Sequence, residues 1–141
     1  MSTMVRSVLI IDDDEDDNFF HKMTIDQSGR VEKIIIAENA LEALEIIRKN
    51  GHPDLIFLDT NMPKMNGWEF VSEYRKMMHP DGNRPIIVLL TTSMSHIDKA
   101  LADRTPEINE FQIKPLSATA LDRILQKYFS ADIYNGDGSL P

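Results

Sequence analysis

The sequence contains no cysteine. Disulfide bonds and thiolate metal sites are therefore excluded, and the absence fits a reducing compartment. Long apolar runs are absent too: residues 1–6 contain none, and Val8–Ile11 is far too short for a membrane segment or a signal peptide. We therefore expect a cytoplasmic protein that has no membrane partner.

Positive charge is scarce as well. The 141 residues include 15 Lys and Arg against 23 Asp and Glu, which gives a net charge of −8 at pH 7. Binding to a phosphate backbone needs a basic face, so nucleic acid is excluded as a direct partner. The length suits one domain, and 42% hydrophobic with 27% charged residues is typical of a globular protein.

Five apolar segments of strand length stand out from this background. They are rich in Ile, Val and Leu rather than alternating with polar residues, as expected of strands buried on both faces of a sheet. Apolar residues at helical spacing lie between them, and in the first such segment these are Phe19, Phe20, Met23 and Ile25. The predicted strands are Val8–Ile11, Ile34–Ala37, Leu55–Leu58, Ile86–Leu90 and Phe111–Ile113.

The alternation of strands and helices predicts the fold class. It implies right-handed crossovers and a parallel sheet covered by helices, that is, a doubly wound α/β fold. We expect a five-stranded, flavodoxin-like sheet with strand order 2-1-3-4-5, in one domain over residues 5–129. The segment 130–141 has too few apolar residues to pack alone, so we expect a flexible tail or a short arm that docks on a partner.

Polar residues follow the predicted strands where each strand ends. Asp12 and Asp13 follow the first strand, Asp59 the third, Thr91 ends the fourth, and Lys114 follows the fifth. Ligands of open α/β sheets bind beyond the carboxyl ends of the strands, at the point where the strand order reverses. With the order 2-1-3-4-5, these side chains meet at one rim.

The residue types at this rim indicate phosphoryl chemistry with a metal. Magnesium takes oxygen ligands, commonly one or two carboxylates with phosphate oxygens. Asp12, Asp13 and Asp59 suit that demand, and a backbone carbonyl near Asn61 is available as a further ligand. A carboxylate can act as nucleophile toward a phosphoryl group, whose charge an ammonium and a hydroxyl can then stabilise.

Four motifs lie in order along the chain: "VLIIDD", "LIFLDTNMPKMNG", "VLLTTS" and "FQIKP". Through them, residues 5–129 resemble the receiver domain of two-component response regulators, of the kind found in bacterial single-domain chemotaxis regulators. The resemblance implies that Asp12 and Asp13 are the family's acidic pair and Asp59 its phosphoacceptor. It also implies that Lys114 is the lysine that precedes a cis proline, here Pro115.

The resemblance further implies a switch. Thr91 matches the family's Ser/Thr, with Thr92 as the alternative hydroxyl, and Phe111 matches the switch aromatic three residues before the lysine. One departure is "TPEINE", residues 105–110, where the family usually carries small residues.

The implied function is a phosphoacceptor switch that uses Mg²⁺. A sensor histidine kinase or a phosphotransfer protein would phosphorylate Asp59, and the signal would pass to a downstream protein target by contact, because no chain remains for an output domain. The protein would catalyse only its own phosphorylation and dephosphorylation. The alternative is a receiver-like adaptor that binds its partner regardless of phosphate.

The acidic run at residues 12–17 allows two other interpretations. Asp12, Asp14 and Asp16 have the spacing of an EF-hand calcium loop, but Asp17 stands where that loop needs Gly. The run also resembles the strand end of haloacid-dehalogenase-type phosphohydrolases, with Asp12 as nucleophile, but those enzymes need more chain. We expect Asp14 to Asp17 to start the first helix instead. No ligand spacing links His21, His52, His79 and His96, which we expect to be structural.

Overall fold

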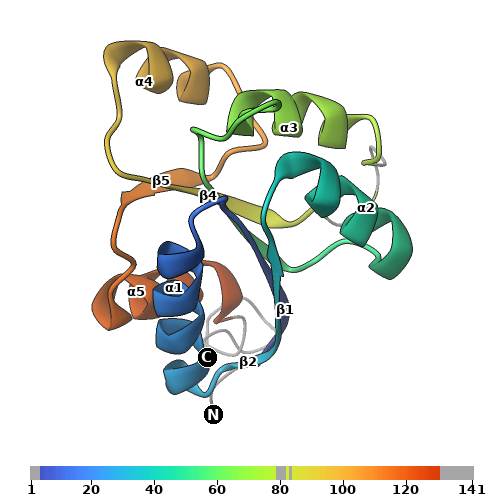
Figure 1. Ribbon diagram of the computed structural model, residues 1–141. Coiled ribbons are helices and arrows are strands. Elements are labelled where there is room, and N and C mark those ends of the chain that lie inside the picture. The colour runs from blue at the N-terminus through green and yellow to red at the C-terminus, as the bar shows by residue number, and fades with distance from the viewer. Residues whose placement is uncertain (1–3, 79–81, 83, 131–141) are drawn as a thin grey trace, which may run out of the picture.

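The structure, a computed structural model, describes residues 4–78, 82 and 84–130 (Figure 1). Strands and helices alternate along this part of the chain. The strands are β1 (Val5–Ile11), β2 (Val31–Ala37), β3 (Leu55–Leu58), β4 (Ile86–Thr91) and β5 (Glu110–Ile113). The helices are α1 (Glu15–Ser28), α2 (Ala40–Asn50), α3 (Gly67–Arg75), α4 (His96–Asp103) and α5 (Ala118–Phe129). The tail 131–141 lies outside the described residues.

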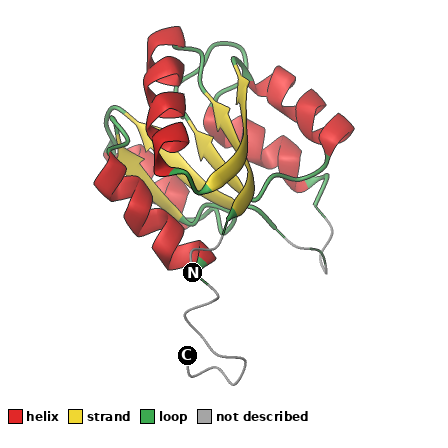
Figure 2. Cartoon of the chain, turned by 90° about the horizontal axis from the view of Figure 1, so that it is seen from below, coloured by secondary structure: helices red, strands yellow, loops and turns green. Residues whose placement is uncertain are grey.

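The five strands form one parallel sheet in the order β2-β1-β3-β4-β5, which confirms the predicted fold class. Helices cover both faces of the sheet (Figure 2). One apolar core lies between the sheet, α2 and α3, and a second lies between the sheet, α1 and α5. None of the described helices is long and apolar enough to cross a membrane.

Burial differs between the central and the edge strands. The apolar residues of β1, β3 and β4 are almost all buried, as the sequence predicts. The prediction is wrong for the edge strands β2 and β5, which alternate or are half-buried. Phe111 and Ile113 of β5 remain 42% and 41% exposed, because an edge strand has a neighbour on one side only.

Helix α1 does not bury the residues that the periodicity indicated. Ile25 is buried as predicted, but Phe19, Phe20 and Met23 are 71%, 42% and 40% exposed, and the polar residues Asn18 and His21 are buried in their place. The acidic run sets this orientation. Asp14 caps the helix by accepting a hydrogen bond from the N–H of Asp17, and Asn18 donates to the carbonyl of Asp12.

Candidate functional site

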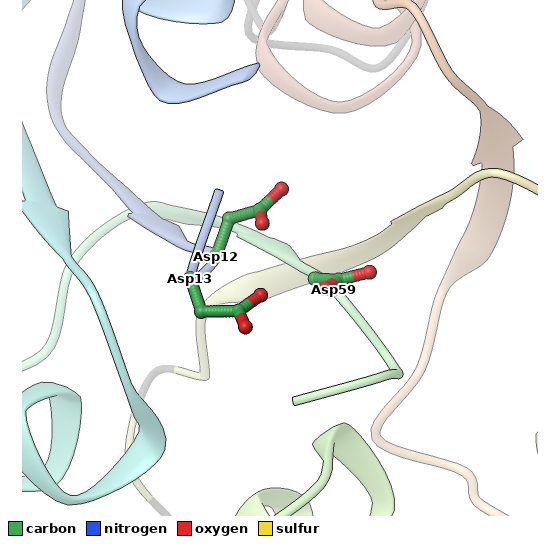
Figure 3. A group of neighbouring side chains, drawn as sticks. All are labelled: Asp12, Asp13 and Asp59. Carbon is green, nitrogen blue, oxygen red and sulfur yellow. The ribbon is translucent and has the colours of Figure 1, made fainter. Parts of the chain in front are cut away.

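Three carboxylates meet at the carboxyl ends of β1 and β3 (Figure 3). One carboxylate oxygen from each of Asp12, Asp13 and Asp59 lies within 4.8 Å of the other two. The sheet produces this arrangement, because Ile11 pairs with Leu58 in register and the Asp59 N–H donates to the Ile11 carbonyl over 2.9 Å. Asp12 and Asp59 are buried, whereas Asp13 is exposed. This is a set of hard oxygen donors suited to Mg²⁺.

The loop after β3 folds back tightly onto Asp59. The Gly67 N–H donates to the carbonyl of Thr60 over 3.1 Å. A Cβ atom at Gly67 would lie 2.7 Å from the Asp59 carbonyl oxygen, closer than side chains tolerate. The glycine of the "KMNG" segment is therefore needed because the backbone of Asp59 approaches it closely.

Lys114 reaches the carboxylates from the end of β5. Its Nζ lies 2.6 Å from Oδ2 of Asp12, 2.8 Å from Oδ2 of Asp17 and 3.8 Å from Oδ1 of Asp59. Burial lowers the pKa of Lys114, but hydrogen bonds to Asp12 and Asp17 outweigh burial and hold this pKa well above its ordinary value. The following peptide bond to Pro115 is cis, as expected.

The carboxylate of Asp59 is held in an unfavourable environment for a negative charge. Burial, followed by repulsion from Asp12, raises the pKa of Asp59 to about 6, although Lys114 and a hydrogen bond from the Asn61 N–H oppose the rise. A cation at the cluster would relieve this repulsion. The carbonyl of Asn61 as a metal ligand stays a prediction.

The predicted switch residues lie on β4 and β5. Thr91 is buried, its Oγ1 lies 3.3 Å from Oγ1 of Thr60, and it donates to the Ser93 carbonyl over 3.1 Å. Thr92, the alternative, is exposed. Phe111 pairs in register with Leu89, two residues before Thr91, so Thr91 and Phe111 project from the same face of the sheet. Phe111 is 42% exposed and lines a surface pocket together with Lys99, Ala102 and Asp103 of α4.

Sequence reasoning missed one member of the site. Asp17 was assigned only to the start of the first helix, yet its carboxylate pairs with Lys114. Its position one helical turn after the acidic pair is a signal that could have suggested this contact. Among the described residues, His21, His52 and His96 join no cluster of three or more acidic or histidine ligands.

The fold and the site define a class: a parallel α/β domain with carboxylates and a lysine at its topological switch point. The chain matches the family described as the response regulator receiver domain over residues 8–126. It therefore belongs to this family and is a receiver domain of two-component signalling.

Known proteins are similar over most of the chain. A two-component response regulator from Cytophaga hutchinsonii has 32% identity and a TM-score of 0.80, over 89% of this chain and 97% of that one. The chemotaxis protein CheY4 of Vibrio cholerae has 28% identity and a TM-score of 0.75, over 90% of this chain and 100% of that one.

One curated relative is much longer than this chain. The protein-glutamate methylesterase/protein-glutamine glutaminase 3 of Burkholderia thailandensis is 33% identical over 115 residues. That match covers 80% of this chain but only 30% of the relative. The similarity therefore concerns the receiver domain, and the enzyme activity that this relative's name gives is not carried over.

Proposed function

We propose that Asp59 accepts a phosphoryl group from a sensor histidine kinase or a histidine phosphotransfer protein. The observation that carries the proposal is the meeting of Asp12, Asp13 and Asp59 with Lys114 at one rim. Nucleophile, oxygen donors for a metal and a fixed ammonium are the components that phosphoryl transfer needs, because its catalysis is mostly positioning and electrostatics.

Asp59 is better placed than Asp12 to act as the nucleophile. Both carboxylate oxygens of Asp12 are engaged, Oδ1 by the Asp14 N–H and Oδ2 by Lys114, at 2.9 and 2.6 Å. Asp59 lies farther from Lys114, at 3.8 Å, and its pKa is raised above the ordinary value of an aspartate. These contacts argue against the haloacid-dehalogenase-type chemistry at Asp12.

In the proposed reaction, an oxygen of Asp59 forms a bond to phosphorus as the bond to the donor nitrogen breaks, and the imidazole leaves with the electron pair. Asp12, Asp13, Asp59 and the carbonyl of Asn61 would hold Mg²⁺, which when bound neutralises charge on the transferring oxygens. Lys114 pairs with the phosphoryl group formed. Later attack of water on phosphorus breaks the bond to the Asp59 oxygen, releases inorganic phosphate and restores the carboxylate, so the protein acts on itself alone.

The proposed signal is a movement of the β4–β5 half of the site. Thr91 can donate to a phosphoryl oxygen only once one is present, which supplies the differential interaction that a population shift requires. Its movement opens space into which Phe111 turns. The face formed by α4, β5 and α5 changes as a result, and a downstream protein target reads that change.

Intact mass after incubation with Mg²⁺ and acetyl phosphate tests the proposal. We expect the mass of one phosphoryl group to be added to the wild-type protein and not to Asp59→Asn. Wild-type protein that stays unlabelled would favour the adaptor that acts without phosphate. Labelling of Asp59→Asn to the wild-type extent would assign the nucleophile elsewhere.

A further inference from the structure

Lys114 is closer to a residue of α1 than to the proposed nucleophile. Its Nζ lies 2.8 Å from Oδ2 of Asp17 and 3.8 Å from Oδ1 of Asp59. An ammonium has three N–H donors, and Asp12 and Asp17 take two of them. The lysine that would stabilise the phosphoryl group is therefore bound by one side chain of the cluster, Asp12, and by one outside it, Asp17.

The position of Asp17 is fixed by the start of α1. Its backbone N–H donates to the capping carboxylate of Asp14 over 2.9 Å, and the next residue, Asn18, donates to the carbonyl of Asp12, which follows β1, over 2.9 Å. The Asp17 side chain is 37% exposed, whereas those of Lys114 and Asp12 are 9% and 3% exposed. Water therefore screens the pair with Asp17 more than the pair with Asp12.

We propose that Asp17 is a positioning residue that holds Lys114 away from Asp59 until a phosphoryl group is present. This inference rests on the proposed phosphorylation of Asp59. In the unphosphorylated protein, Asp17 draws the ammonium toward α1 and adds one negative charge beside the path of an anionic donor. Transfer places a group of higher charge at Asp59, and Lys114 then exchanges its solvent-screened contact with Asp17 for a contact with that group.

The competition has a direct consequence for rate. Without the Asp17 carboxylate, Lys114 keeps its buried bond to Asp12 and is free to turn toward Asp59. We expect Asp17→Asn to be phosphorylated by acetyl phosphate about three- to tenfold faster than the wild type, the range that one nearby, partly screened charge produces. The amide is close in size to the carboxylate, so the helix start is retained.

Asp16→Asn is the matched control. Asp16 is the preceding residue of α1, it is exposed, and it forms no ion pair within the described part of the chain. The control therefore removes the same charge from the same helical turn without touching Lys114. We expect its rate to stay within about twofold of the wild type, because exposed charges are strongly screened.

The contact itself is measured in the unphosphorylated protein. The NMR signal of the Lys114 side-chain ammonium reports how fast its protons exchange with water, and a structural role of Asp17 in the helix would not alter it. We expect several-fold faster exchange in Asp17→Asn and no change in Asp16→Asn. Together, faster labelling and faster proton exchange in Asp17→Asn alone support the proposal.

Two results would overturn it. Equal labelling rates for Asp17→Asn and Asp16→Asn would mean that only general charge matters, and unchanged proton exchange at Lys114 would mean that Asp17 does not hold the lysine. Wild-type protein that takes up no phosphoryl group would instead contradict the proposed function. The NMR measurement would then decide alone whether Asp17 holds Lys114.

Discussion

The two halves of the site lie on strands with different surroundings. The β1–β3 half consists of Asp12, Asp13 and Asp59 at the ends of central strands, where the neighbouring residues are buried. The β4–β5 half consists of Thr91, tied to Thr60 and Ser93, and Phe111, which is 42% exposed on the edge strand. The first half brings carboxylates together on two central strands, and the second extends from the buried Thr91 of β4 to the exposed Phe111 of the edge strand β5.

Under the proposed function, chemistry and signalling fall to separate parts of one sheet. Nucleophile and metal donors must keep their geometry, so they benefit from central strands packed on both faces. A switch needs two arrangements of similar free energy, and an edge strand with few buried contacts costs less to rearrange. Lys114, at the end of β5 but bonded to Asp12, connects the two halves.

The largest effect is expected in the β1–β3 half, from Asp59→Asn. An amide has no carboxylate to attack phosphorus, so labelling by acetyl phosphate should be lost altogether while the fold persists. Intact mass and circular dichroism measure the two properties. Labelling of Asp59→Asn to the wild-type extent would mean that Asp59 is not the phosphoacceptor.

The same substitution should alter stability in a pH-dependent way. The pKa of Asp59 is about 6 in the folded protein and about 4 in an unfolded chain. Between these values the folded state binds a proton that the unfolded state has lost, so the free energy of unfolding falls as the pH rises from about 4 to about 6. The amide of Asp59→Asn does not ionise, so the free energy of unfolding of this variant does not fall in that pH range. Above about pH 6 it should be about 1–3 kcal/mol higher than that of the wild type.

Urea denaturation without Mg²⁺ measures this difference. It should vanish below about pH 4, where both states of the wild type are protonated. Added Mg²⁺ should reduce it at neutral pH, since a bound cation favours the Asp59 carboxylate. Equal stability of the two proteins near neutral pH would show that burial and repulsion do not destabilise the Asp59 carboxylate.

A smaller effect is expected from Asp13→Asn. Asp13 is the exposed carboxylate of the cluster, and we expect it to be the main metal ligand of the acidic pair, with Asp12 acting partly through water. The loss of one charged oxygen donor should weaken Mg²⁺ binding about tenfold or more and slow phosphorylation with it. Titration followed by Trp68 fluorescence measures the affinity, and an unchanged value would remove Asp13 from the metal site.

The smallest effect on the reaction is expected in the β4–β5 half. Thr91→Ala should leave Mg²⁺ binding unchanged and slow labelling of Asp59 only a few-fold, about the value of one neutral hydrogen bond. Hydrogen exchange at residues 108–116, which surround Phe111, should then no longer respond to phosphorylation. Lys114→Ala, as a comparison variant, should disturb both labelling and response.

An equal change in exchange on phosphorylation of wild type and Thr91→Ala would falsify the coupling. The phosphoacceptor role of Asp59 would survive that result. The proposed division into a reactive β1–β3 half and a signalling β4–β5 half would be wrong, because Thr91 would then not couple phosphorylation to β5.

The fold and most of the residues at the rim could be predicted from local sequence patterns. Strands and helices depend on local periodicity, so Leu55–Leu58 was predicted with its observed bounds, although β1 and β2 each begin three residues earlier than predicted. Strand order and the rule that ligands bind at carboxyl strand ends then placed Asp12, Asp13 and Asp59 together. The burial of Asp12 and Asp59 follows from their being the next residues after buried strands, whereas Asp13, one residue farther along, is exposed.

The inward-facing side of α1 and the contacts of Lys114 depend on long-range packing, which local sequence patterns do not show. Helical spacing favoured Phe19 and Phe20 as core residues, but the capping by Asp14 and the bond from Asn18 to β1 turn them outward. The pair of Asp17 and Lys114 joins residues 97 positions apart. A contact between two surfaces that the sheet brings together leaves no trace in local periodicity, because neither segment needs the other to form its helix or strand.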